Sequence, residues 1–203
     1  MTKRTTRNRQ GRIWRAAIFS LSLLTCFGLP SNAGFPSAMC ARQSASPLTQ
    51  QDIVKQLVDL AATKEAFTFT PATAQQKLGK LAKLDLVKEP NNPDLQRLLG
   101  ANSDSGIQWI EVVFERSKTS WKFREATFAF APGDGGLDKL YNDFKPLLGA
   151  KLGKQTEETP TYGAIWDLKP RYSVQLMKEN SAVNPITEKM QQTVMIHLAI
   201  DPV

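Results

Sequence analysis

Large apolar residues recur at helical spacing in three places in the first half of this chain. The first stretch, residues 49–62, opens with a capping threonine and carries one apolar stripe. The second starts at Pro71, because proline is favoured in the first turn of a helix. A third, short helix is expected after Asn92, with three leucines on one face and Gly100 at its end. The pattern therefore predicts a helical part over residues 48–100.

The period of the pattern changes from helical to alternating after residue 105. Residues 107–116 are rich in β-branched and aromatic side chains, and residues 121–131 continue them as a hairpin partner. In the second run the large apolar residues lie at odd positions first and at even positions later. Because one extra residue reverses the facing of all that follow, we expect a β-bulge near Glu125 or Ala126.

A long amphipathic helix and further strands complete the pattern. Leucine and aromatic residues between positions 137 and 148 follow helical spacing, and Pro146 is expected to kink or end this helix. A polar, mobile loop is expected over residues 179–190. Three strands are predicted, at residues 164–168, 171–178 and 193–200.

This order of elements favours an α+β fold of two layers, in a single domain over residues 48–203. Long crossovers between parallel strands are scarce, so we expect a mainly antiparallel sheet of about five strands. One long amphipathic helix and the N-terminal helices would pack on it, with a hairpin, helix and three strands over residues 106–201. The succession helix, Leu-Gly, loop, Gly-x-x-Trp and strands occurs twice, at Trp109 and Trp166, and is compatible with a degenerate α-β duplication.

Residues 1–33 have the pattern of a secretory signal peptide, in which a basic stretch precedes a short apolar run and small residues. Cleavage is expected between Ala33 and Gly34, and the apolar run is shorter than the roughly 20 residues of a membrane span. Of the 26 Lys and Arg residues, six precede residue 34, which leaves 20 against 19 acidic residues. The exported body would therefore be close to neutral, which disfavours a nucleic-acid partner.

A second cleavage site is also compatible with the N-terminal sequence. Leu-Leu-Thr-Cys, ending at Cys26, resembles a bacterial lipobox, and its lipidated cysteine would hold the protein at a membrane. The main prediction is a periplasmic or secreted protein with a disordered leader over residues 34–47, and the alternative is a lipid anchor through Cys26. After cleavage at residue 33, Cys40 is the one remaining cysteine and cannot form an internal disulfide.

The chemistry of the remaining residues favours a protein without a catalytic centre. His197 is the only histidine, and no nucleophile motif, metal-ligand set or phosphate-binding glycine pattern is present. We therefore expect no catalytic residue, no metal and no cofactor. Glu157 and Glu158 could supply a carboxylate pair for glycoside hydrolysis, but adjacent residues in this polar stretch are more typical of a solvated loop.

The first predicted hairpin carries mixed charges, which suggest a surface that binds another protein. Its candidate binding residues are Trp109, Glu111, Trp121 and Arg124, with either tryptophan as an anchor if it points outward and a core residue otherwise. The leading hypothesis is an exported bacterial protein that binds another protein, such as an inhibitor, an immunity-like protein or an envelope accessory factor.

Two other functions remain as alternatives. One is a hydrolase of envelope polymers that uses carboxylates. The other is a carrier of lipids or small molecules, which would need a cavity between the long helix and the sheet, with Phe144 or Trp166 facing the ligand.

Overall fold

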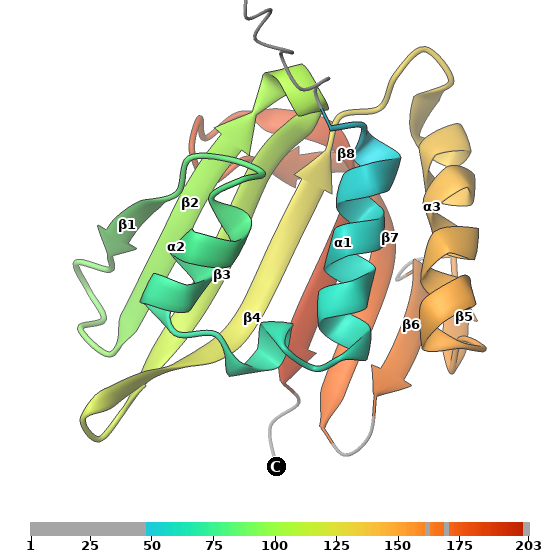
Figure 1. Ribbon diagram of the computed structural model, residues 1–203. Coiled ribbons are helices and arrows are strands. Elements are labelled where there is room, and N and C mark those ends of the chain that lie inside the picture. Colours follow the sequence, from blue (N-terminus) through green and yellow to red (C-terminus); the bar gives the residue numbers. More distant parts are fainter. Residues whose placement is uncertain (1–47, 161–162, 169–170, 201–203) are drawn as a thin grey trace, which may run out of the picture. The chain divides into compact units, whose positions relative to one another are not determined.

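One eight-stranded antiparallel sheet organises the part of the chain that the structure describes (Figure 1). The computed structural model describes residues 48–160, 163–168 and 171–200, so the predicted signal peptide, leader, Cys26, Ala33, Gly34 and Cys40 lie outside it. The α-helices are α1 (Gln50–Ala62), α2 (Pro71–Leu78) and α3 (Gly136–Leu152). The strands are β1 (Asp85–Lys88), β2 (Leu95–Asn102), β3 (Ile107–Ser117), β4 (Ser120–Phe130), β5 (Glu157–Thr159), β6 (Gly163–Leu168), β7 (Tyr172–Val183) and β8 (Met190–Ile200).

The strand order β1-β2-β3-β4-β8-β7-β6-β5 divides the sheet into two meanders that meet at β4 and β8. This confirms a mixed α+β fold with an antiparallel sheet, although the sheet has eight strands rather than about five. Helix α2 precedes the first meander and α3 precedes the second, so a helix followed by four strands occurs twice. The echo in the sequence does not match this repeat, because Trp109 lies on the third strand of one meander and Trp166 on the second strand of the other.

The helix starts predicted at both N-terminal sites are confirmed by their caps. The Thr49 side chain accepts a hydrogen bond from the backbone N–H of Asp52, at 3.2 Å. Thr70 caps α2 in the same way through Thr73, and Pro71 occupies the first turn. A capping residue satisfies N–H groups that have no partner within the helix, which stabilises a helix by about 1 kcal/mol.

The third predicted helix is wrong, because residues 95–102 form strand β2. Of its three leucines only Leu98 is fully buried, and β2 gains hydrogen-bonding partners on both sides, from β1 and β3. The Asn92 side chain accepts the N–H of Asp94 in a turn and does not start a helix. Gly100 allows a close approach of the backbone, since a Cβ there would lie 2.3 Å from the carbonyl oxygen of Lys83.

The predicted bulge in β4 is confirmed. Val113 pairs with Glu125 and Phe114 with Phe123, which leaves Arg124 as the extra residue, one position before the expected site. Because of this bulge, Phe123 and Phe128 both face the core although their positions have different parity.

Two further expectations about the second half need correction. Pro146 does not end α3, which continues to Leu152, and Phe144 and Leu148 on either side of the proline are buried in the core. The expected loop over residues 179–190 is shorter than predicted, since β7 continues to Val183 and β8 begins at Met190, which leaves only residues 184–189 outside the strands.

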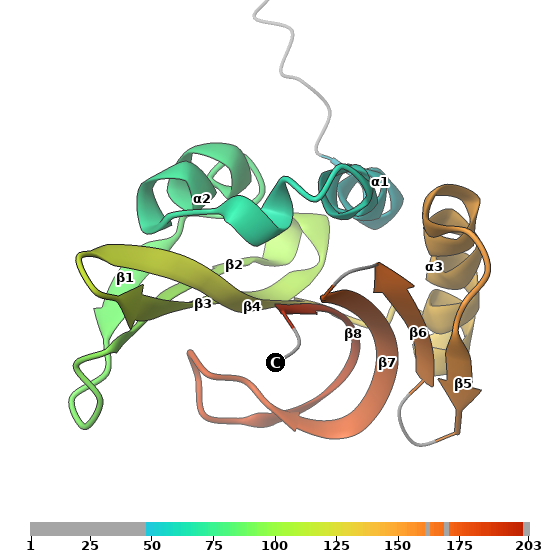
Figure 2. The same ribbon diagram turned by 90° about the horizontal axis from the view of Figure 1, so that it is seen from below.

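All three α-helices lie on the same face of the sheet (Figure 2). Alternate residues of the two central strands project toward them, among them Phe128 of β4 and Ile196 of β8. The Phe144 ring of α3 meets the Phe130 ring edge to face, with centroids 5.0 Å apart. Each such buried side chain contributes about 1.5–3 kcal/mol relative to an exposed one, so this layer supplies the main core.

Candidate protein-binding face

The sheet face opposite to the helices is termed the helix-free face. Because side chains alternate along a strand, the neighbours of the core residues project onto it. One row runs across four strands in register, from Glu111 through Thr127 and His197 to Gln175. The helix-free face comprises these four residues and Arg97, Trp109, Val113, Glu125, Ala129, Asp167, Met177, Met195 and Ala199.

Part of the helix-free face is covered by the arm, defined as residues 179–192 at the joined ends of β7 and β8. A register shift between Glu179 and Ala182 bends this hairpin out of the plane of the sheet. The arm then passes below β3 and β4 in Figure 2. The Gln108 side chain of β3 holds the arm in this position, because its Nε2 donates a hydrogen bond to the Gln192 carbonyl oxygen at 3.0 Å.

Trp109 lies on the helix-free face but is only 3% exposed. It does not belong to the core between helices and sheet, so its burial has another cause. Gln108, the extra residue of a bulge in β3, connects directly to the arm. We attribute the burial of Trp109 to the arm. Because Trp109 is buried, it does not serve as the exposed anchor that the sequence suggested.

Glu111 is held in place by an arginine. Arg97 Nη1 lies 2.9 Å from Glu111 Oε1, and the same guanidinium contacts Glu89. The hydrogen bond to Glu89, followed by that to Glu111, raises the pKa of Arg97 above its ordinary value. Since all three side chains are only partly exposed, they form an ordered row of charges at one side of the helix-free face.

His197 lies at the centre of the helix-free face. Its Nδ1 is 3.1 Å from Thr127 Oγ1, and its Nε2 is 3.8 Å from Glu125 Oε2. Burial lowers the pKa of His197, while the carboxylates of Glu125 and Glu111 act in the opposite direction. The imidazole is therefore neutral near pH 7.

The row of hydroxyl, imidazole and carboxylate at His197 does not have the geometry of a hydrolase triad. The 3.8 Å between His197 Nε2 and Glu125 is too long for a hydrogen bond. Thr127 lies within the paired region of β4, between β3 and β8, where the backbone N–H groups are used in the sheet. Such N–H groups cannot stabilise an oxyanion, and acyl transfer at Thr127 is disfavoured.

The other two predicted binding residues lie on either side of the sheet. Trp121 is partly exposed and packs against the core on the helix side. Arg124 is the bulged residue, its side chain is 49% exposed, and its Nε lies 3.8 Å from Glu125 Oε1. The structure therefore places Glu111 on the helix-free face and Arg124 at the bulge of β4, leaves Trp109 buried and places Trp121 on the opposite side.

A hollow of about 770 Å³, termed the basic hollow, lies where the β3–β4 hairpin meets the end of β8. Charged side chains from separate parts of the chain line it, and Phe123, Ala199 and Ile200 add apolar surface. Its charged residues are Arg116, Lys122, Arg124, Arg171, Glu115 and Glu125. Sequence patterns indicated the mixed charge of the hairpin but not Arg171, which comes from the turn before β7.

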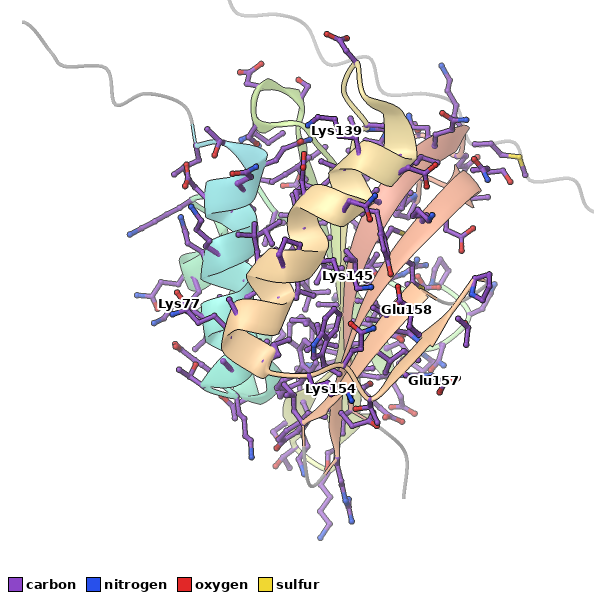
Figure 3. The ribbon with its side chains drawn as sticks, turned by 90° about the vertical axis from the view of Figure 1, so that its right-hand side faces the viewer. Lys77, Lys139, Lys145, Lys154, Glu157 and Glu158 are labelled. Atoms are coloured by element: carbon purple, nitrogen blue, oxygen red, sulfur yellow. The ribbon has the colours of Figure 1, made fainter. Side chains whose placement is uncertain are left out.

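The carboxylate pair considered for glycoside hydrolysis is separated by the structure. Glu157 and Glu158 are consecutive residues of β5, so their side chains project to opposite sides. Figure 3 shows Glu158 beside Lys145 and Glu157 away from it. Lys145 Nζ lies 2.6 Å from both Glu158 carboxylate oxygens, and this contact lowers the pKa of Glu158. The pair cannot flank one glycosidic bond in this arrangement.

A lipid or small-molecule carrier would need an internal cavity beside Phe144 or Trp166. Between α1, α2 and the sheet, the gap lined by residues such as Leu57, Phe69 and Phe128 is too narrow to admit a water molecule. Phe144 and Trp166, the residues expected to face a carrier cavity, are fully buried in the core. In the described residues no group of three or more His, Cys, Asp or Glu side chains is placed to hold a metal ion.

Comparisons with protein-family models, with curated proteins and with solved structures yield no match to this chain. No helix in the described ranges is long and apolar enough to cross a bilayer.

Proposed function

We propose that this chain is an exported bacterial protein that binds another protein through the helix-free face of its sheet and catalyses no reaction. An inhibitor, an immunity-like protein and an envelope accessory factor are the forms of this function that the sequence favours. Export rests on the signal pattern that ends at Ala33.

The observation that supports this proposal most is the order of the charged side chains on the helix-free face. Arg97 holds Glu111 from one side, and Glu125 lies beside both His197 and Arg124. These groups are positioned by neighbouring strands before any partner arrives, so little side-chain entropy would be lost on binding. Charges arranged in this way favour specificity and fast association with a complementary protein.

The alternative functions receive less support. A carrier needs an internal cavity, whereas the gap between α1, α2 and the sheet is too narrow for one, and Phe144 of α3 is fully buried in the core. A carboxylate hydrolase needs two acids facing one bond, whereas Glu157 and Glu158 project to opposite sides.

Site-specific photo-crosslinking tests the binding face. A photo-reactive amino acid at Asp167 or Gln175, both on the helix-free face, should give a covalent adduct with one envelope protein. The matched controls are the same amino acid at Lys55 of α1 and Lys139 of α3, which are well exposed on the helix side. Adducts mainly from the control positions would contradict the proposed face. Turnover of an envelope polymer without any adduct would contradict the proposed function.

The export part of the proposal has a separate test in the mass of the protein secreted by a bacterial host. A mass that begins at Gly34 is expected. A diacylated form that begins at Cys26 would support the lipid-anchored alternative, and an uncleaved cytoplasmic chain would contradict export.

A further inference from the structure

We propose that the basic hollow binds an acidic peptide segment of the partner protein. This inference rests on the proposed function and names the chemistry that the partner offers. The hollow combines four cationic side chains with two carboxylates, in an exported chain whose total charge is close to zero. Positive charge is thus concentrated at one concave place on the surface.

Three of the four cations are available to a ligand. Arg116, Lys122 and Arg171 form no ion pair with any residue that the structure describes. The fourth, Arg124, has its Nε at 3.8 Å from Glu125, beyond hydrogen-bond distance. Charged groups that the protein leaves without an internal partner can be neutralised by a ligand of opposite charge.

The positions of these cations follow from the fold. Lys122 pairs with Glu115 across the hairpin, and Arg116 pairs with Trp121, so their Cα positions are set by the ladder. The bulge adds Arg124 on the same strand. Arg171 precedes β7, whose neighbour β8 brings it near the hairpin. Guanidinium groups held by several strands can bind carboxylates with two parallel hydrogen bonds each.

The two carboxylates in the hollow favour a peptide over a nucleic acid. Glu115 and Glu125 would repel an unbroken row of phosphates. A peptide instead offers spaced carboxylates, which the arginines can bind. It also offers backbone N–H groups, from which the Glu115 carboxylate can accept hydrogen bonds. The partly exposed apolar surface of Ala199 and Ile200 adds contact area for the methylene groups of acidic side chains.

The test measures binding of a fluorescent eight-residue peptide of alternating Glu and Gly to residues 34–203 by fluorescence anisotropy. We expect saturable binding that weakens as salt is added, and at least tenfold weaker binding when Gln replaces Glu in the peptide. The double variant K122E/R124E should lose at least tenfold in affinity. The matched control K80E/K83E changes the net charge equally at exposed residues outside the hollow and should bind as the unchanged protein does.

A single-stranded oligonucleotide with the same number of negative charges is the competing ligand. Tighter binding of the oligonucleotide than of the peptide would overturn the proposal, as would equal losses in the two double variants. E115Q provides a second readout, since it should strengthen binding of the oligonucleotide more than binding of the peptide. If crosslinking identifies a partner but the peptide does not bind, the acidic-segment proposal fails and the proposed function stands. If neither occurs, both fail.

Discussion

Gln108 of β3 and Gln192 of β8 are joined by a hydrogen bond of 3.0 Å, although β4 lies between these two strands in the sheet. A side chain cannot reach over a neighbouring strand in a flat sheet, whose strands are about 4.8 Å apart, unless the far strand bends out of the plane. The ladder between β4 and β8 ends at Phe130 and Val194, and the hydroxyl of the next residue, Thr193, donates to the Phe130 carbonyl oxygen at 3.1 Å. From there the arm extends over the helix-free face (Figure 2), and we attribute the burial of Trp109 to it.

Replacing Trp109 tests whether the arm creates a second, smaller core. Trp109→Ala should lower the free energy of unfolding by about 3–5 kcal/mol, since a buried tryptophan is replaced by a cavity. Urea unfolding followed by circular dichroism measures this loss. Trp121→Ala serves as a control with a smaller expected loss, because Trp121 is partly exposed. A loss below about 1 kcal/mol for Trp109→Ala would show that the arm does not cover this residue.

His197 should make the protein less stable in mild acid. Burial lowers its pKa in the folded state below the ordinary value of about 6.5, so near and below that pH the unfolded chain binds more protons than the folded one. The resulting stability is complete above pH of about 6.5 and is lost as the pH falls toward the lowered folded pKa. Thermal unfolding between about pH 5 and pH 8 measures the effect.

The control for this pH dependence is His197→Gln, which cannot titrate in this range. It should reduce the change in melting temperature between mild acid and pH 8, and Glu125→Gln should enlarge it because a carboxylate that favours the charged imidazole is removed. An unchanged pH profile in His197→Gln would assign the effect to other groups.

Two glycines should respond in opposite ways to alanine. Gly163 has φ of 74°, and a Cβ there would lie 1.9 Å from the Leu176 carbonyl oxygen. Gly163→Ala should therefore destabilise the protein by well over 1 kcal/mol. Gly149, inside α3, has open space at the same position, and Gly149→Ala should stabilise the protein by about 0.5–1 kcal/mol. Chemical unfolding of both variants measures the change in the free energy of unfolding. Destabilisation by Gly149→Ala would contradict the presence of open space for a Cβ at Gly149.

Arg97 should contribute stability that depends on salt. Arg97→Met removes the contacts to Glu89 and Glu111 and is expected to cost about 1 kcal/mol at low salt, since these side chains are only partly buried. In about 1 M NaCl the difference from the unchanged protein should shrink, because charges are screened over a few ångströms. Lys55→Met, which removes an exposed pair on α1, should have almost no effect. A cost for Arg97→Met that does not change with salt would point to lost packing.

Local signals in the sequence predicted much of the fold. The caps at Thr49 and Thr70, the long helix and the bulge, predicted near Glu125 and found at Arg124, each depend on a few neighbouring residues, and each appears in the structure. The predictions are wrong where tertiary contacts, and not neighbouring residues, determine the secondary structure. Residues 95–102 have leucines at helical spacing, yet the ladder between β1 and β3 makes them a strand. The strands β1 and β5 have 4 and 3 residues, too few to show a period.

The candidate site was predicted only in part, for the same reason. The mixture of charges and aromatics in one hairpin points to Glu111 and Arg124, and this mixture is a local property of the sequence. The burial of Trp109, which we attribute to the arm, depends on residues far along the chain, as the spacing of 84 positions between Gln108 and Gln192 shows. Arg171 likewise reaches the basic hollow only through the pairing of β7 with β8.

The meeting of the two meanders at β4 and β8 also has a kinetic consequence. Every other neighbouring pair of strands in the sheet is consecutive along the chain, and each can form by closing a short loop. The pairing of β4 with β8 instead joins residues such as Thr127 and His197, which are 70 positions apart. Closing so long a loop has a larger entropic cost than closing a hairpin. The contacts between β4 and β8 offset this cost only when both meanders are in place. This junction is therefore the step expected to limit the rate at which the chain folds.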